Sequence, residues 1–225
     1  MNKIKWIIFA TFTIGILTVL VLVSNGSKID VSKVDVATIQ IASSENGNIA
    51  DHTKGDLNSK VVLIEYGDYQ CPGCASYDPL IQAVIDGYKD KIVYVFRTYL
   101  LSYHTNARAA ASTAEAAGLQ GKYWEMHTLL YSNQSDWESL GIDERTTYFA
   151  NLASQIGLNQ DQYKKDIASV SVKEKINFDI ALAVKAGLTA TPSLYLNGKS
   201  VDLTNLKTKD SFRAVLDAAI AEKNK

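Results

Sequence analysis

The sequence predicts an α/β fold in which helices flank a central mixed β-sheet, with an inserted all-helical subdomain and an N-terminal transmembrane helix. Two apolar, β-rich segments, at residues 61–68 and 92–100, enclose a helical pattern. A long helical block follows, and a strand-turn-strand pattern then returns before a last helix. The two cysteines of the chain, Cys71 and Cys74, stand at the start of the first helical pattern.

Residues 1–23 have the pattern of an N-terminal signal anchor. Lys3 and Lys5 precede an uncharged, mostly apolar run of 18 residues at positions 6–23, and a helix of this length crosses most of a ~30 Å hydrocarbon core. A cleaved secretory signal is the alternative, although its apolar region is usually shorter, roughly 7 to 15 residues. Positive charge before the run predicts a single-pass protein of the cell membrane with its main domain outside the cytoplasm, or a secreted domain after cleavage.

Residues 24–46 are polar and rich in small side chains, which predicts a tether between the membrane and the domain. The first half of the α/β fold is expected at residues 47–103. Within it, strand, helix and strand follow one another in about 40 residues, and such a βαβ unit places its two strands in parallel.

The helical subdomain is predicted at residues 104–188. Residues 106–132 are rich in alanine but contain Gly118 and Gly121, so they favour two helices or one broken helix. Asn159 and Ser171 each precede a Gln or Glu by three positions, the pattern of a capping box at a helix start.

The second half of the fold is expected at residues 189–225. Two short β-rich segments flank Asn197 and Gly198, the strongest short-range signal for a β-hairpin in this chain. Thr208 then opens a terminal helix that has an apolar stripe.

Composition argues against a nucleic-acid partner. The formal net charge is -1, with 47% apolar and 21% charged residues, so there is no basic excess to neutralise phosphates. These proportions are ordinary for a globular domain.

The close spacing of Cys71 and Cys74 allows three interpretations: half of a zinc site, a structural staple or a redox pair. A zinc site needs further ligands, and no ligand spacing links His104 or His127 to the cysteines. We expect His127 to pack beside Trp124 in a helix instead. An oxidising compartment outside the cytoplasm lets a disulfide persist, which also argues against zinc.

A redox pair at a helix start has a physical basis. The N-terminus of a helix directs unpaired N–H groups and a partial positive charge at the sulfur of Cys71, which lowers the pKa of that thiol. Pro72 suits the first helical turn, where its missing N–H has no role. Since neither Pro72 nor Gly73 carries a charge or a side-chain donor, we expect backbone N–H groups to provide most of the stabilisation. Cys71 should attack, and Cys74, one turn deeper, should resolve the mixed disulfide.

Three motifs together resemble one known family. The segment YGDYQCPGC after a buried strand, the helical insertion and the later TPSLYLNG are similar to the DsbA-like thiol-disulfide oxidoreductases of the thioredoxin superfamily, in their membrane-anchored or secreted bacterial branch. The resemblance covers about residues 47 to 222. It implies a thioredoxin fold and makes Cys71 and Cys74 the catalytic pair.

The resemblance also assigns roles to neighbouring residues. Pro192 corresponds to the cis-proline beside the active disulfide, and Thr191 before it would present backbone groups to an extended substrate peptide. Glu65 matches the buried acidic residue that assists proton transfer at Cys74, and burial would raise its pKa. The alternatives are an exposed Glu65 at a strand end and an ordinary trans Pro192. Asp68, Tyr69 and Gln70 are expected to shape the rim without chemistry of their own, and Glu115 is expected on a solvated helix face.

The function that the resemblance implies is disulfide donation to reduced, unfolded exported proteins by a monomer without a small-molecule cofactor or metal. A quinone-linked membrane oxidase would reoxidise the pair. One alternative is a reductase or isomerase fed by a membrane electron donor, although residues 24–46 look too short for a dimerisation domain. Another is a peptide-binding chaperone module in which the disulfide is structural.

Overall fold

The computed structural model describes residues 29–223, so the expected transmembrane helix at residues 1–23 lies outside the described part. Within residues 29–223, no helix is long and apolar enough to cross a bilayer. Contacts divide the chain into Met1–Asp30 and Val31–Lys225, and the fold below is that of the second unit.

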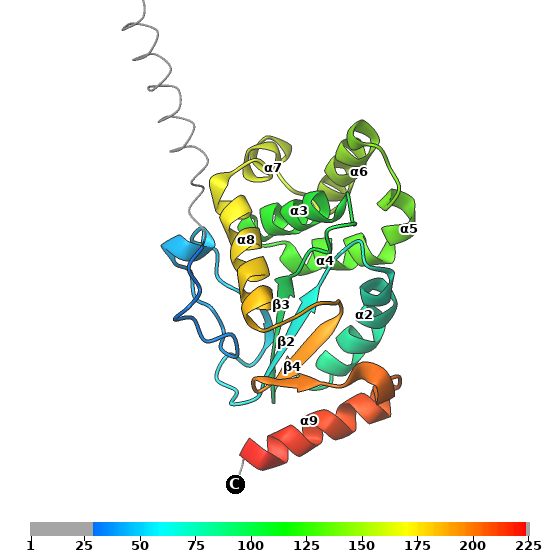
Figure 1. Ribbon diagram of the computed structural model, residues 1–225. Coiled ribbons are helices and arrows are strands. Elements are labelled where there is room, and N and C mark those ends of the chain that lie inside the picture. The colour runs from blue at the N-terminus through cyan, green and yellow to red at the C-terminus, as the bar shows by residue number, and fades with distance from the viewer. Residues whose placement is uncertain (1–28, 224–225) are drawn as a thin grey trace, which may run out of the picture. The chain divides into compact units, whose positions relative to one another are not determined.

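A mixed five-stranded sheet forms the centre of the fold, as predicted (Figure 1). The strand order is β1-β3-β2-β4-β5. Strands β2 and β3 run parallel, while the β1–β3, β2–β4 and β4–β5 pairs are antiparallel. The strands are β1 (His52–Gly55), β2 (Val62–Gly67), β3 (Val93–Thr98), β4 (Ser193–Leu196) and β5 (Lys199–Val201).

The two central strands are buried along almost their whole length, because their side chains pack on both faces of the sheet. All six residues of β3 are buried, and five of the six in β2. Helix α2 (Pro72–Ile85) connects them, which confirms the predicted βαβ unit. Glu65 lies within β2, opposite Phe96 on one side and Leu194 on the other.

Six helices form the inserted block between β3 and β4. Gly121, with φ 72°, separates the first two of them, as the glycine pattern predicted. Asn159 caps α7 by accepting a hydrogen bond from the Gln162 amide at 2.9 Å. The start expected at Ser171 was placed two residues late, because Ser169 caps α8 by accepting from the Val172 amide. The helices are α3 (Ala107–Leu119), α4 (Tyr123–Ser132), α5 (Gln134–Trp137), α6 (Ile142–Gln155), α7 (Gln160–Asp166) and α8 (Val170–Lys185).

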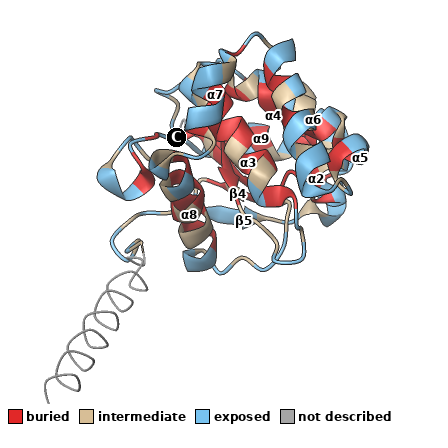
Figure 2. Ribbon diagram, turned by 90° about the horizontal axis from the view of Figure 1, so that it is seen from above, coloured by how far each residue is buried: buried red, intermediate tan, exposed pale blue. Residues whose placement is uncertain are grey.

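The helices of the inserted block differ in how far they are buried. Figure 2 shows mainly buried residues along α3 and mainly exposed ones along α6.

After α8 the chain returns to the sheet with β4 and β5. Asn197 and Gly198 adopt φ values of 50° and 79° and link these two strands, as the hairpin signal predicted. The short helix η2 (Leu203–Asn205) and α9 (Lys209–Lys223) complete the chain, and α9 begins directly after Thr208.

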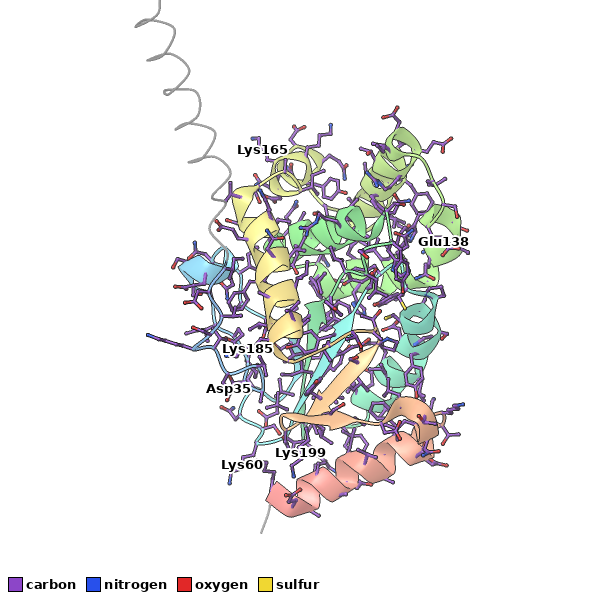
Figure 3. All side chains as sticks on the ribbon, in the orientation of Figure 1. Asp35, Lys60, Glu138, Lys165, Lys185 and Lys199 are labelled. Atoms are coloured by element: carbon purple, nitrogen blue, oxygen red, sulfur yellow. The ribbon has the colours of Figure 1, made fainter. Side chains whose placement is uncertain are left out.

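Residues 31–46, within the expected tether, lie against the rest of the domain. The Lys185 ammonium at the end of α8 donates to the carbonyls of Val31, Ser32 and Val34 at 2.6 to 2.8 Å (Figure 3). Arg97 donates to the carbonyls of Val36 and Thr38. The short helix η1 (Ser44–Asn46) follows and packs on α8. Buried and surface cations therefore bind the backbone of residues 31–46.

A buried cluster of four charged residues fixes the attachment of residues 31–46 to the domain. Arg97 and Asp51 form an ion pair at 2.7 Å, and Lys175 contacts Asp51 at 3.3 Å and Asp179 at 2.6 Å. All four side chains are almost fully buried. Because each charge has a partner, the cluster ties β3, α8 and the segment before β1 together.

Candidate active site

The two cysteines occupy the beginning of α2. Cys71 is the N-cap residue, with extended backbone angles of φ -76° and ψ 119°, and Pro72 is the first helical residue. The Cys71 carbonyl accepts the first helical hydrogen bond, from the Ala75 amide at 3.1 Å. Both thiols are free; Cys71 is 7% exposed and Cys74 is fully buried. This geometry confirms the predicted placement of an outer and an inner sulfur.

A loop from the other half of the fold approaches the outer sulfur. The Thr191–Pro192 peptide bond is cis, so the alternative of a trans proline is wrong. The Cys71 Sγ lies 3.5 Å from the Thr191 carbonyl oxygen. A Cβ on Gly73 would lie 3.5 Å from the Pro192 Cδ and 3.6 Å from the Cys71 Sγ, an ordinary contact distance. The sequence-predicted residues of the dithiol and the Thr-Pro motif therefore meet in one site.

The site gives the two thiols opposite acidities. Hydrogen bonding to the Cys74 thiol, together with Thr191 and the amides of Cys74 and Gly73, lowers the pKa of Cys71 from 9.0 to about 5 against the effect of burial. Burial, followed by the hydrogen bond to Cys71 and the charge of Glu65, raises the pKa of Cys74 well above its ordinary value. Backbone N–H groups contribute, but the largest single stabiliser of the Cys71 thiolate is the second thiol, which differs from our expectation.

Glu65 is buried below the dithiol. Its carboxyl group is 1% exposed, and the Tyr94 hydroxyl donates to its Oε2 at 2.6 Å. Burial raises the pKa of Glu65 to about 8, although the Tyr94 hydrogen bond acts in the opposite direction. The alternative of an exposed Glu65 is wrong, since β2 runs through the middle of the sheet.

A second buried acid, Asp78, was not singled out in the sequence. It follows Cys74 by four residues on α2 and is 7% exposed. His127 Nε2 lies 3.0 Å from Asp78 Oδ1, and His127 Nδ1 lies 3.0 Å from the Tyr69 hydroxyl. Burial lowers the pKa of His127, so the ring is neutral near pH 7 and can donate to Asp78 while accepting from Tyr69. The spacing of Cys74 and Asp78 on one helical face was available as a signal, whereas the contact with His127 was not.

Some residues expected at the surface are buried. Asp68 and Tyr69 are fully buried, and Asp68 accepts from the amides of Gln70 and Leu101. They are therefore part of the interior before α2 and do not lie at the rim. Glu115 is also buried and lies 2.8 Å from His52, so the expectation of a solvated face was wrong there. His127 does pack beside Trp124, with ring centroids 5.2 Å apart.

The described side chains offer no obvious metal centre. Within residues 29–223, no group of three or more His, Cys, Asp or Glu residues is placed to hold a metal ion. The chemistry that this geometry can carry out is thiol-disulfide exchange at Cys71, with acid-base assistance from the buried carboxyl group of Glu65.

Comparison with known families and solved structures supports the fold. A family model described as Thioredoxin matches residues 47–218. BdbD from Bacillus subtilis superimposes with a TM-score of 0.66 at 20% identity, covering 82% of this chain and 98% of that one. DsbA1 from Wolbachia pipientis gives 0.64 at 22% identity, covering 76% and 92%. MdbA from Actinomyces oris, described as a thiol-disulfide oxidoreductase, gives 0.62 at 17% identity, covering 75% and 85%. These likenesses confirm the predicted DsbA-like thioredoxin fold.

The similar curated sequences are named as Na(+)/H(+) antiporters and not as oxidoreductases. The Na(+)/H(+) antiporter NhaA 1 of Salinispora arenicola is 31% identical over 150 residues, which is 66% of this chain and 22% of the antiporter. The protein of the same name from Mycolicibacterium vanbaalenii is 34% identical over 151 residues, or 66% and 23%. The chain therefore spans less than a quarter of the length of these relatives.

Proposed function

The chain belongs to the thioredoxin family, and we propose that it is a DsbA-like oxidase that donates a Cys71–Cys74 disulfide to reduced proteins. The observation that carries this proposal is the contrast between the two thiols. The outer Cys71 has a pKa of about 5, whereas burial holds the pKa of the inner Cys74 far above its ordinary range. Such a pair has one good leaving group and one resolving thiol.

The reaction follows from the exposure of the two sulfurs. A substrate thiolate attacks the Cys71 sulfur of the oxidised protein, a mixed disulfide forms, and Cys74 leaves as a thiolate that takes up a proton. Glu65, with a pKa of about 8, still holds a proton near neutral pH and lies close enough for its charge to act on Cys74, so we assign proton delivery to it. The second substrate thiolate then attacks the substrate sulfur and releases Cys71 as a thiolate. Two electrons pass from the substrate dithiol to the protein.

The low pKa of Cys71 also supports the direction of transfer. Every interaction that stabilises the Cys71 thiolate stabilises the reduced protein relative to its disulfide, and this makes the disulfide a better oxidant. The cis Thr191–Pro192 bond and the Thr191 carbonyl beside the Cys71 sulfur supply a backbone surface for an extended substrate peptide.

We further propose that the domain acts outside the cytoplasm as a monomer. Residues 6–23 would anchor it in the cell membrane, or it would be secreted after cleavage. The support for this location is the sequence pattern of residues 1–23. The family resemblance supports reduced exported proteins as substrates and a quinone-linked membrane oxidase as the partner that restores the disulfide.

The test is the equilibrium of the dithiol in glutathione buffers of graded ratio, combined with stoichiometric oxidation of a reduced model protein. We expect a potential above roughly -180 mV and formation of the model protein's disulfide. A Cys71→Ser variant serves as the control, because it keeps Cys74 but cannot form the pair. A potential near that of thioredoxin, about -270 mV, with no disulfide transferred, would refute the oxidase and favour a reductase.

A further inference from the structure

The inserted helical block holds each residue of the segment that leads into the dithiol. Asp68 contacts His104 at 2.8 Å, and the Tyr69 hydroxyl lies 3.0 Å from His127. The Gln70 side chain accepts from the Asn106 amide at 2.6 Å and donates to the carbonyl of Glu138 at 2.8 Å; Glu138 follows α5 (Figure 3). The position of the catalytic segment therefore depends on side-chain and backbone groups from outside the central sheet.

Within this group, Gln134 makes the contact with the nucleophilic residue itself. Its side-chain Nε2 donates to the carbonyl of Tyr69 at 2.6 Å and to the carbonyl of Cys71 at 3.1 Å. Gln134 is 8% exposed, so the amide is largely shielded from competing water. The two acceptors lie two residues apart on either side of Gln70, and one amide group thus spans the backbone just before α2.

Gln134 is itself firmly positioned. It is the first residue of α5, whose Trp137 is fully buried and donates from its indole to the Leu130 carbonyl at 2.9 Å. The side-chain Nδ2 of Asn106 donates to the carbonyls of Trp137 and Glu138 at 3.2 and 3.1 Å. A side chain held in this way can fix the groups that it binds.

We propose that Gln134 is a positioning residue for Cys71, and this inference rests on the proposed function. By holding the carbonyls of residues 69 and 71, Gln134 keeps Cys71 in its extended N-cap conformation, with its sulfur beside Cys74 and the first amides of α2. The Ala75 amide binds the same Cys71 carbonyl at 3.1 Å, but it lies inside the helix and places no restraint on Tyr69. The helical insertion thereby contributes to the acidity of the catalytic thiol.

The first variant is Gln134→Met, which has a similar length and no donor. We expect the Cys71 thiolate to lose part of its alignment, so that the pKa of Cys71, followed by the ultraviolet absorbance of the thiolate, rises by about half to one unit. The equilibrium with glutathione should then shift about three- to tenfold toward the disulfide. A tenfold shift corresponds to a potential lower by about 30 mV.

Two further variants separate positioning from general stability. Gln134→Glu keeps the shape but loses the amide donor, so it should raise the pKa in the same direction. Gln120→Met is the matched control, because the Gln120 amide also binds two backbone groups, the carbonyl and amide of Asn159, at an exposed site. We expect Gln120→Met to leave the pKa of Cys71 and the glutathione equilibrium unchanged.

A rise in the pKa of Cys71 in both Gln134 variants and not in the control would support the proposal. It would be overturned if the Gln134 variants lowered only the melting temperature, or if Gln120→Met shifted the equilibrium equally. The pKa measurement needs no substrate. Failure of the wild-type protein to oxidise a reduced protein would therefore count against the proposed function alone, while the pKa would still decide the role of Gln134.

Discussion

Replacing Glu65 by glutamine should stabilise the fold while it impairs the proposed chemistry. Glu65 has a pKa of about 8 in the folded protein, raised from an ordinary 4.5 chiefly by burial. Between these two values the folded state keeps a proton that the unfolded state has lost. The free energy of unfolding of the wild type therefore falls as the pH rises through this window. The contribution that the protonated Glu65 makes to this free energy is complete below pH 4.5 and is lost by about pH 8. Glutamine does not titrate, so it removes this dependence.

The size of the effect follows from the width of the window. Each pH unit corresponds to about 1.4 kcal/mol, which gives about 5 kcal/mol over the whole window and about 3 kcal/mol at pH 7. The introduced glutamine would still accept from the Tyr94 hydroxyl, but its buried NH₂ group would lack an assigned acceptor, a cost of roughly 1 to 3 kcal/mol. The net gain is then about 0 to 2 kcal/mol at pH 7 and about 2 to 4 kcal/mol above the pKa of Glu65, and the sign reverses at acidic pH because only the amide cost remains.

The assay is urea unfolding of the reduced wild-type and Glu65→Gln proteins across the pH range 4 to 9, roughly the window set by the two pKa values. We expect the difference in the free energy of unfolding to grow with pH and to level off above the pKa of Glu65. A difference that stays constant with pH would refute a buried, proton-holding Glu65. Transfer of the disulfide to a reduced protein should be slower in Glu65→Gln below about pH 8, where the wild-type carboxyl group holds its proton, since Cys74 loses its proton donor.

The remaining predictions concern the thiols and the buried charge cluster. Alkylation of Cys71 should rise with pH through a midpoint of about 5 and stay level near pH 7; a midpoint near 9 would contradict the lowered pKa. In Cys74→Ala that midpoint should rise, because the Cys74 thiol is the largest stabiliser of the Cys71 thiolate. Once Cys71 of this variant has been converted to a mixed disulfide with glutathione, the thiolate of a reduced protein should attack the Cys71 sulfur, release glutathione and stay trapped as a mixed disulfide. If nothing is trapped, the peptide-binding alternative gains ground. Lys175→Met should lower the free energy of unfolding by about 3 to 5 kcal/mol, because Asp51 and Asp179 would lose a buried cation; a loss below about 1 kcal/mol in a denaturant titration would show that the cluster relaxes.

Local patterns were sufficient to predict the framework of the fold. The β-branched runs of β2 and β3, the Asn197–Gly198 turn and the break at Gly121 each depend on neighbouring residues, so periodicity and turn chemistry identify them. The course of residues 31–46 was not predictable in this way. It depends on Arg97 and Lys185, which are distant in sequence and reach backbone carbonyls that any sequence would offer.

The same distinction applies to the site. Cys71 and Pro192 belong to motifs that sequence alone identifies, and the family resemblance added Glu65. His127 contacts Tyr69 across 58 positions of the sequence, and Gln134 contacts Cys71 across 63. No local pattern indicates these contacts. The lowered pKa of Cys71 was predicted from the helix start, but its largest cause, the Cys74 thiol, depends on the relative placement of two sulfurs in space.

The short outer strands of the sheet matter for a protein proposed to meet unfolded chains. Such chains seek unpaired strand edges, and adding a strand there would lead to aggregation. Here β5 has three residues and begins at the exposed Lys199, while β1 has four. The Trp124 indole N–H donates a hydrogen bond to the Thr53 carbonyl of β1 at 3.0 Å. If the proposed function holds, an unfolded substrate would find little backbone to extend at either margin, and the contact that remains to it is the Cys71 sulfur and the Thr191–Pro192 loop beside it.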